Sequence, residues 1–213
     1  VLTNAPAEGE RIDANLLKLR LFRGHPLTII EHGKKIKTPE ADSYYGESSI
    51  YVTDQREITL EELIEQGKLT NKEYMLLSFG SALCPFCGSI YPYYRELNSQ
   101  YGDRIQIVTI YDAPQSLEDV KEKLNLLKEN KTGKPTQEDF NTLNFVVAEQ
   151  DVIMQFSEDL LLDRIPQIFL IDYNGKILYR SQEEDMAEIF KAIHESDNPI
   201  PANDRLCEIL EIH

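Results

Sequence analysis

The chain has 213 residues, of which 22 are lysine or arginine and 37 are aspartate or glutamate, so its formal net charge at pH 7 is -15. An acidic surface offers no counter-charge to nucleic acid or to an anionic membrane, so we expect neither as a partner. No apolar run approaches the roughly 18 residues of a membrane span. Hydrophobic residues make up 41% of the chain, which is ordinary for a globular protein with one core.

Residues 1–48 are mixed and polar, and we interpret them as an N-terminal extension. Within them, residues 16–22 alternate between apolar and polar side chains, which favours a strand. Residues 34–49 are charged and irregular, so they predict no regular element.

The pattern becomes sharper after this extension. Residues 50–52 and 56–58 predict two short strands on either side of a turn at residues 54–55. Thr59 and Glu62 have the spacing of a capping box, which predicts a short helix that ends near Gly67.

The rest of the chain alternates between apolar strands and amphipathic helices. Strands are expected at 75–79, 105–111, 145–148, 167–171 and 176–179, and helices at 116–130, 152–156 and 183–194. Asn174-Gly175 between the last two strands is typical of a hairpin turn. This order predicts an α/β fold with a central mixed sheet flanked by helices. We expect one domain over residues 49–194 and a C-terminal extension over 195–213.

Two cysteines, Cys84 and Cys87, stand in a Cys-Pro-Phe-Cys motif soon after the strand at 75–79. A helix is expected to follow the motif and to run to about Tyr101, with a kink at Pro92. Cys84 would then lie at a helix N-terminus, where backbone amides and the macrodipole favour a thiolate, the form that attacks disulfides. The motif therefore indicates redox chemistry.

These and other side chains can also be interpreted without redox chemistry. Cys84 and Cys87 could form a static disulfide or remain as buried thiols. Cys207 is interpreted as a core-facing residue of a terminal helix, and Glu149 and Asp151 are weak candidates for assisting proton transfer. The tyrosines at 91, 93 and 94 are interpreted as residues that contribute to helix packing or lie on the surface. A metal site is not expected, because the histidines offer no second ligand pair at a suitable spacing; they are His25, His32, His194 and His213.

Four features in this order resemble the thioredoxin-fold redoxin family, and within it the TlpA-like and ResA-like thiol-disulfide oxidoreductases. They are the lead-in at 57–63 and 76–81, the motif at 84–87, Pro92 five residues past Cys87, and residues 164–176, which resemble the family's cis-proline strand and hairpin. The resemblance covers about residues 49–194 and implies a thioredoxin-like fold. It also implies a cis peptide bond before Pro166.

The resemblance implies a mechanism as well. Cys84 would attack a disulfide of a partner protein, and Cys87 would resolve the mixed disulfide. Substrate would bind beside Pro85 and Phe86, and the backbone of Ile165 next to Pro166 would pair with an extended substrate segment. No cofactor beyond the dithiol is implied. The partners would be protein thiols or disulfides, outside the cytoplasm, in a periplasmic or secreted location.

The sequence departs from the thioredoxin pattern at two positions: Ser78 stands where thioredoxin has a buried acid, and Leu83 stands where tryptophan is usual. The sequence is more weakly similar to peroxiredoxins, since Ser81 matches one of the two residues that they place ahead of the reactive cysteine. It is also weakly similar to iodothyronine deiodinases, at residues 79–81 and 84–85. A thiol peroxidase or deiodinase-like reductase using Cys84 therefore stays as an alternative. A thioredoxin-fold metallochaperone that binds Cu(I) is a third one.

Overall fold

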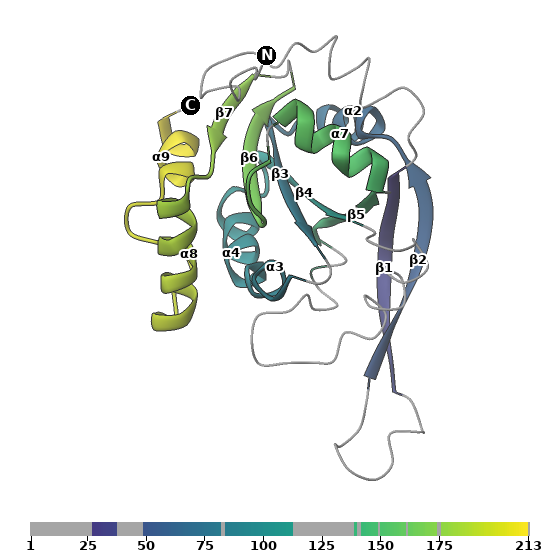
Figure 1. Cartoon of the computed structure of the whole chain (residues 1–213), viewed down its shortest axis with the longest axis horizontal. Helices are drawn as coiled ribbons and strands as arrows, with labels where there is room; N and C mark the ends of the chain where they lie inside the picture. The colour runs from purple at the N-terminus through teal and green to yellow at the C-terminus, as the bar shows by residue number, and fades with distance from the viewer. Residues whose placement is uncertain are drawn as a thin grey trace.

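A seven-stranded sheet forms the centre of the protein (Figure 1), with the strand order β2-β1-β5-β4-β3-β6-β7. The computed structural model describes residues 27–37, 49–81, 84–112, 139, 142–148, 150–160, 162–173 and 176–212. Its strands are β1 (Leu27–Lys37), β2 (Ser49–Ile58), β3 (Tyr74–Ser81), β4 (Ile105–Asp112), β5 (Asn144–Ala148), β6 (Gln167–Asp172) and β7 (Ile177–Arg180). The helices in the described ranges are α2 (Leu60–Leu69), α3 (Pro85–Ser89), α4 (Tyr91–Tyr101), α7 (Gln150–Leu160), α8 (Glu183–Glu195) and α9 (Arg205–Ile212).

The sheet is mixed, as the sequence predicts. Strands β3, β4 and β5 run parallel to one another, whereas β6 pairs antiparallel with β3, and β7 antiparallel with β6. Parallel neighbours need connections that cross a face of the sheet, which is why helices cover both faces. This arrangement confirms the thioredoxin-like α/β fold.

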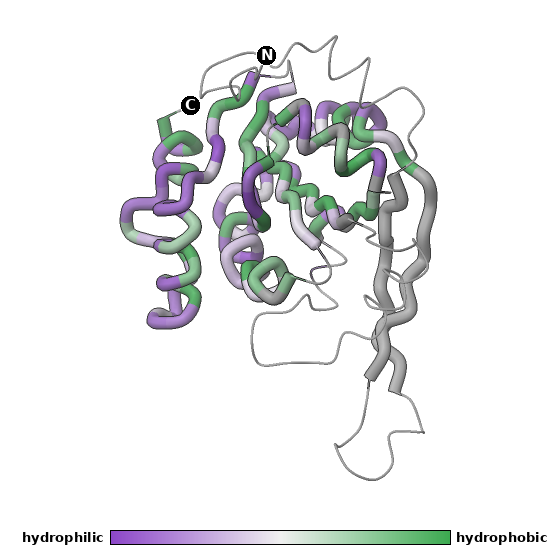
Figure 2. The backbone as a smooth tube through the Cα atoms, viewed as in Figure 1, coloured by the Kyte–Doolittle hydropathy of each residue, from purple (hydrophilic) through white to green (hydrophobic). Residues whose placement is uncertain are grey.

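Two apolar clusters lie on the two faces of the sheet. Leu76 of β3 packs on one face with residues of α4, α8 and α9, and Leu77 packs on the other face with residues of α2 and α7. Successive residues of a strand point to opposite faces, so one continuous apolar strand serves both clusters. Figure 2 shows the result, with apolar strands inside and hydrophilic residues on the outer sides of the helices.

The N-terminal part of the sheet differs from the expectation. Residues 27–37 form β1, which lies between β2 and β5, so the charged residues Lys34, Lys35 and Lys37 are in a strand. The turn expected at 54–55 is wrong, because β2 is continuous there and pairs Asp54 with Glu31 of β1. Backbone hydrogen bonds between β1 and β2 satisfy the polar groups of this part of β2. The register of the pairing shifts in β1 instead, between Glu31 and Lys34.

Most of the other expected elements are confirmed. The capping box is present, since the Glu62 amide donates to Thr59 Oγ1 at 3.1 Å and the Thr59 amide donates to Glu62 Oε2 at 2.8 Å. Helix α2 ends at Leu69, two residues beyond Gly67, and α7 is longer than the expected 152–156. The strand expected at 16–22, the helix at 116–130 and the turn residues 174–175 lie outside the described residues.

The helix after the motif is divided into α3 and α4 at Ile90, with Pro92 in the first turn of α4. Proline cannot donate a backbone hydrogen bond to the preceding turn, and this accounts for the expected break. Among the helices that the structure describes, none is long and apolar enough to cross a membrane.

Candidate active site

Cys84 and Cys87 lie where β3 leads into α3. Cys84 is the N-cap of α3 with extended backbone, and the amide of Cys87 donates to Cys84 Sγ at 3.3 Å. Pro85 occupies the first turn, where a missing N–H costs nothing. Both cysteines are thiols; Cys84 is half-buried, whereas Cys87 is only 2% exposed. Cys84 is therefore the more accessible of the two sulfurs.

Gly80 at the end of β3 allows Cys87 to approach the sheet closely. A Cβ atom on Gly80 would lie 3.2 Å from Cys87 Cβ and 3.3 Å from Cys87 Sγ, closer than ordinary van der Waals contact. The same Cβ would lie 3.7 Å from the ring of Tyr111. The absence of a side chain at Gly80 thus helps to set the position of the second sulfur.

The peptide bond between Ile165 and Pro166 is cis, which confirms the expectation from the resemblance. The carbonyl oxygen of Ile165 lies 4.0 Å from Cys84 Sγ. The residue is 45% exposed, whereas Pro166 is buried. A partly exposed residue of the loop before Pro166 therefore lies beside Cys84.

Phe86 gives the site an apolar surface. The residue is 60% exposed, and its ring centroid lies 5.6 Å from that of Phe190 on α8. Phe190 supports one side of the Phe86 ring while much of the residue stays in contact with water. Phe86 and Ile165 are two large apolar residues that stay exposed, and both lie near Cys84.

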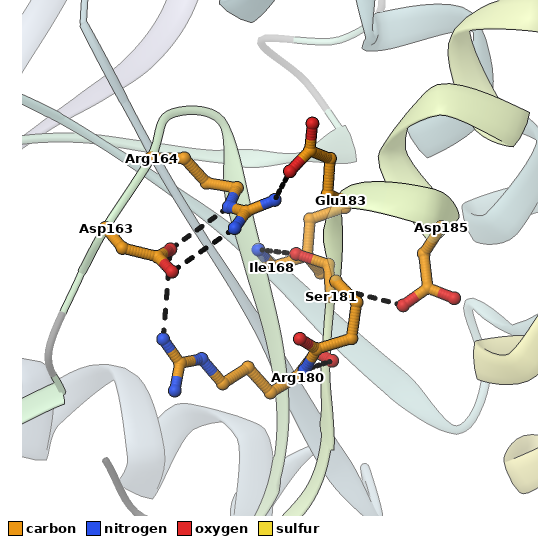
Figure 3. A network of polar contacts seen from close by, with 8 residues as sticks. Asp163, Arg164, Ile168, Arg180, Ser181, Glu183 and Asp185 are labelled. Atoms are coloured by element: carbon orange, nitrogen blue, oxygen red, sulfur yellow. Dashed lines mark hydrogen bonds and ion pairs between the residues drawn. The ribbon is translucent and has the colours of Figure 1, made fainter. Parts of the chain in front are cut away.

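A network of charges holds the segment that precedes Pro166 (Figure 3). Asp163 accepts two hydrogen bonds from Arg164, at 3.1 and 3.2 Å, and its carboxylate lies 3.8 Å from the guanidinium of Arg180 on β7. Arg164 also lies 3.6 Å from Glu183 at the start of α8. The hydrogen bond from Arg164 is the main reason why the pKa of Asp163 is lowered, so the carboxylate stays ionised. The network links this segment to β7 and α8.

Buried hydroxyl pairs lie between the sheet and α4, on the side of Cys87. Ser78 is hydrogen-bonded to the hydroxyl of Tyr94, and Tyr91 is hydrogen-bonded to the hydroxyl of Tyr111. Burial raises the pKa of Tyr94, so its hydroxyl stays protonated at neutral pH. The tyrosines at 91, 93 and 94 are all fully buried, so the surface part of their interpretation is wrong.

Three further residues were singled out in the sequence, namely Cys207, Asp151 and Glu149. Cys207 on α9 is buried, as expected, and burial is the main reason why its pKa is raised to about 12. Asp151 is exposed and accepts a hydrogen bond from the Val152 amide, and Glu149 is outside the described residues. Within the described ranges, no group of three or more histidine, cysteine or acidic side chains could hold a metal ion.

Sequence reasoning found the two cysteines and Pro166 but missed their surroundings. The charge network of Asp163 and Arg164 joins residues whose spacing in the sequence carries no periodic signal. In the sequence, only the adjacent acidic and basic residues shortly before Pro166, Asp163 and Arg164, could have indicated this network. The hydroxyl pairs join different elements, so only the fold reveals them.

The Redoxin family model matches residues 55–197, more than half of the chain, and this range includes the motif and the cis-proline. The chain belongs to the redoxin family. Among solved structures, this redoxin is similar to the thioredoxin domain of a thiol-disulfide oxidoreductase from Bacteroides vulgatus, with 20% identity over 65% of this chain and 86% of that one, and a TM-score of 0.44.

It is also similar to StoA from Bacillus subtilis, with 18% identity over 59% of this chain and 79% of that one, and a TM-score of 0.39. An exposed lipoprotein thioredoxin from Streptococcus pneumoniae is 18% identical over 67% of this chain and 92% of that one, with a TM-score of 0.43. No curated protein matches the sequence.

Proposed function

We propose that this redoxin is a thiol-disulfide oxidoreductase that exchanges disulfides with a partner protein through Cys84 and Cys87. The observation that carries the proposal is the position of Cys84. Its sulfur accepts a hydrogen bond from the Cys87 amide and lies 4.0 Å from the carbonyl oxygen of Ile165, a residue that is 45% exposed. Cys84 has the more accessible sulfur of the pair and Cys87 the buried one, which suits Cys84 to the first attack and Cys87 to the second.

The exchange proceeds in two steps. Cys84 thiolate attacks one sulfur of the partner's disulfide, so that a bond to Cys84 forms and the partner's bond breaks; the released sulfur takes up a proton. Cys87 then gives up its proton and attacks Cys84, and the second sulfur of the partner leaves and is protonated. Two electrons have then passed from the dithiol to the partner. The reverse sequence oxidises a dithiol.

Ile165 and Pro166 bind the substrate segment in this mechanism, together with Pro85 and Phe86 of the motif. The backbone of Ile165 pairs with an extended segment of the partner, which places the partner's sulfur beside Cys84. The side chain of Phe86 contributes apolar contact. Phe86 and Ile165 are accessible to a partner, with exposed fractions of 60% and 45%.

We place this activity outside the cytoplasm, in a periplasmic or secreted location, as in the TlpA-like group that the motifs resemble. The dithiol itself carries the electrons, so the reaction as written needs no further cofactor. No observation favours a peroxidase, a deiodinase-like reductase or a Cu(I) metallochaperone over disulfide exchange.

The test compares variants of each cysteine in exchange with a disulfide-bonded peptide. Cys84→Ser is expected to abolish exchange, because the attacking sulfur is gone. Cys87→Ser is expected to accumulate a mixed disulfide, visible as a mass increase that dithiothreitol removes. Cys207→Ala is the matched control and is expected to keep the wild-type rate, since Cys207 is buried on α9. Wild-type turnover in Cys84→Ser would contradict the mechanism.

The direction of electron flow follows from the reduction potential of the pair, measured by equilibration against glutathione or dithiothreitol. A value near about -270 mV indicates a reductant supplied by another thiol system, and one near about -120 mV indicates an oxidant of folding proteins. If the two cysteines form no disulfide at any potential, the exchange function is wrong.

A further inference from the structure

The buried hydroxyl pair of Ser78 and Tyr94 contains one hydrogen-bond donor more than it uses. Each hydroxyl carries one O–H group, and the hydrogen bond between the two takes up only one of them. Within the part of the chain that the structure describes, neither hydroxyl has a further hydrogen-bond partner. Because both residues are buried, the second O–H group is also shielded from water. A buried donor without an acceptor is costly, so this group is available to an acceptor that forms nearby.

The pair lies on the same face of β3 as Cys87. Alternate residues of a strand point to the same face and are about 6–7 Å apart along it, so Ser78 and Gly80 are neighbours there. A Cβ atom on Gly80 would lie 3.3 Å from Cys87 Sγ, which places the sulfur over that position. Tyr94 belongs to the same buried cluster as Cys87, and their helices α4 and α3 follow one another along this face (Figure 1). The Tyr94 hydroxyl therefore reaches β3 one side-chain position away from the second sulfur.

The other titratable groups packed around Cys87 are one thiol and two phenols. They are Cys84 of the motif, Tyr91 of α4 and Tyr111 of β4, and the neighbouring strand β6 contributes the apolar Ile168 to the same cluster. Burial is the main reason why the pKa values of Tyr91 and Tyr111 are raised, so both phenols stay neutral. These groups supply no charge that could stabilise or destabilise a thiolate at neutral pH, apart from the sulfur of Cys84 itself.

The buried acidic residues on this side of the sheet act elsewhere. Burial, and after it the charge of Asp204, raises the pKa of Tyr93, the neighbour of Tyr94 in α4. Asp139 accepts two hydrogen bonds from Arg95 of α4, both at 2.8 Å. Among the described residues, no carboxylate contributes to the raised pKa of Tyr94. A hydroxyl group is therefore what this side of the sheet offers to Cys87.

The second step of exchange requires a thiolate at Cys87, which is only 2% exposed. A buried charge is strongly destabilised unless it is hydrogen-bonded, and a hydrogen bond to the charged form favours ionisation. Burial is the main reason why the pKa of Tyr94 is raised, and the charge of a Cys87 thiolate raises it further. Tyr94 therefore keeps its proton and can act as a donor, but not as a base. Because a phenol is more acidic than the hydroxyl of serine, Tyr94 is the stronger donor of the pair, and Ser78 donates to the phenol oxygen.

We propose that the Tyr94 hydroxyl donates a hydrogen bond to the Cys87 thiolate and thereby assists the second step. The proposal rests on the exchange function proposed above and adds a residue to it. The bond between Cys87 and Cys84 forms while the bond between Cys84 and the partner's sulfur breaks. The proton that Cys87 gives up ends on the sulfur that leaves, whereas Tyr94 keeps its own proton throughout.

The first test measures the ionisation of Cys87 directly and needs no exchange. Nuclear magnetic resonance of isotope-labelled cysteine follows Cys87 as the pH is raised in the full chain with Cys84→Ser. Adding Tyr94→Phe is expected to raise the midpoint of this titration by about one pH unit, because a hydrogen bond to the charged form is lost. Tyr93→Phe is the matched control, since it removes a buried hydroxyl from the same helix, and it is expected to leave the midpoint unchanged. An unchanged midpoint in a folded Tyr94→Phe variant would overturn the proposal.

The pH profile of the second step gives a readout that a purely structural role would not change. Below the midpoint, Tyr94→Phe has about tenfold less thiolate, but the more basic thiolate attacks about threefold faster. Release of a fluorescent peptide from the mixed disulfide is therefore expected to be about threefold slower than in the wild type below the midpoint. Above both midpoints it is expected to be about threefold faster. A variant that is slower by the same factor at every pH would overturn the proposal.

Ser78→Ala tests which hydroxyl donates. This variant keeps the phenol and removes only the group that donates to it, so its midpoint is expected to shift less than that of Tyr94→Phe. An equal or larger shift in Ser78→Ala would transfer the role to the serine and overturn the assignment to Tyr94.

The two measurements also separate this proposal from the exchange function. If the wild type exchanges with a disulfide-bonded peptide and Tyr94→Phe leaves the Cys87 titration unchanged, only the role of Tyr94 is wrong. If the titration shifts as expected but the wild type exchanges with no disulfide, the proposed function is wrong, and the hydrogen bond from Tyr94 to Cys87 is confirmed without it.

Discussion

Gly80 determines how closely Cys87 can approach the end of β3. Its missing side chain leaves room for the second sulfur, since a Cβ there would lie 3.3 Å from Cys87 Sγ. In the second step of exchange Cys87 must reach the sulfur of Cys84, and the rate of such a step depends steeply on position. We therefore propose that Gly80 is a positioning residue for the second step of the proposed exchange.

We expect Gly80→Ala to displace Cys87 by a few tenths of an ångström and to lengthen the lifetime of the mixed disulfide. A slowing of about threefold to tenfold is reasonable, given that a displacement of about 1 Å can cost about a hundredfold. The measurement is the release of a fluorescent peptide from the mixed disulfide after rapid mixing. The rate of the first attack by Cys84 serves as the control and is expected to stay unchanged. Equal release rates in the variant and the wild type would show that a methyl group at position 80 does not displace Cys87.

At the scale of single residues, the sequence singled out the candidate reactive groups and not the residues that contact them. Cys84, Cys87 and Pro166 belong to a local pattern that can be seen in the chain itself. The contact between Gly80 and Cys87, and the pair of Ser78 with Tyr94, join residues brought together by the packing of α3 and α4 on the sheet. A sequence pattern does not fix the positions of side chains from different elements.

Helix α9 illustrates how a buried charge acts at the scale of one element. Asp204 precedes the helix, and its Oδ1 accepts a hydrogen bond from the Cys207 amide at 3.1 Å. The residue is only 8% exposed, and burial raises the pKa of its carboxyl group above the ordinary value of 3.8. The folded state therefore holds the proton more tightly than the unfolded state. Burial of the ionised carboxylate therefore destabilises the folded state. This destabilisation is absent at low pH, grows as the pH rises from the ordinary pKa to the pKa in the folded state, and is complete above the latter.

We expect Asp204→Asn to raise the free energy of unfolding at pH 7.5 relative to the wild type. Asparagine keeps the oxygen that caps α9 but carries no charge, so the desolvation cost disappears. The difference is expected to close as the pH falls below about 4, where aspartate is neutral in both states. Urea unfolding at several pH values is the measurement.

The matched control for this helix is Asp204→Ala, which removes the charge and the cap together. It is expected to be about 1 kcal/mol less stable than Asp204→Asn, which is the value of a lost N-cap. A wild type more stable than Asp204→Asn at pH 7.5 would show that hydrogen bonds to the carboxylate outweigh its burial.

Among whole elements, those predicted best have a strong periodicity and a local start signal. Helix α2 has its capping box, β3 and β4 are rich in large apolar residues, and α8 has a regular apolar face with Met186 and Ile189 buried. Strand β1 was missed because charged residues such as Lys34 and Lys35 carry no strand signal. Its place between β2 and β5 comes from pairing with strands that are distant in the sequence.

At the scale of the whole molecule, the position of β1 bears on where the domain begins. The sequence predicts a domain that starts at residue 49, with residues 1–48 as an extension. In the structure Ile29 of β1 pairs with Arg56 of β2 on one side and with Val146 of β5 on the other. Without β1, the backbone groups of β5 on that side would lose their ladder partners and β2 would lose its link to the sheet. We therefore propose that β1 contributes to the stability of the core.

Proline substitutions in β1 test this proposal. Ile29→Pro removes a ladder donor where β1 has neighbours on both sides, whereas Lys35→Pro does so where β1 pairs only with Tyr51 of β2. We expect Ile29→Pro to lower the free energy of unfolding by at least about 1–3 kcal/mol, the cost of leaving a buried partner unsatisfied. Lys35→Pro is expected to have a much smaller effect on the core transition, measured by urea unfolding with tyrosine fluorescence. Equal and small effects of both substitutions would show that the core folds independently of β1, and the domain boundary would then lie where the sequence predicts it.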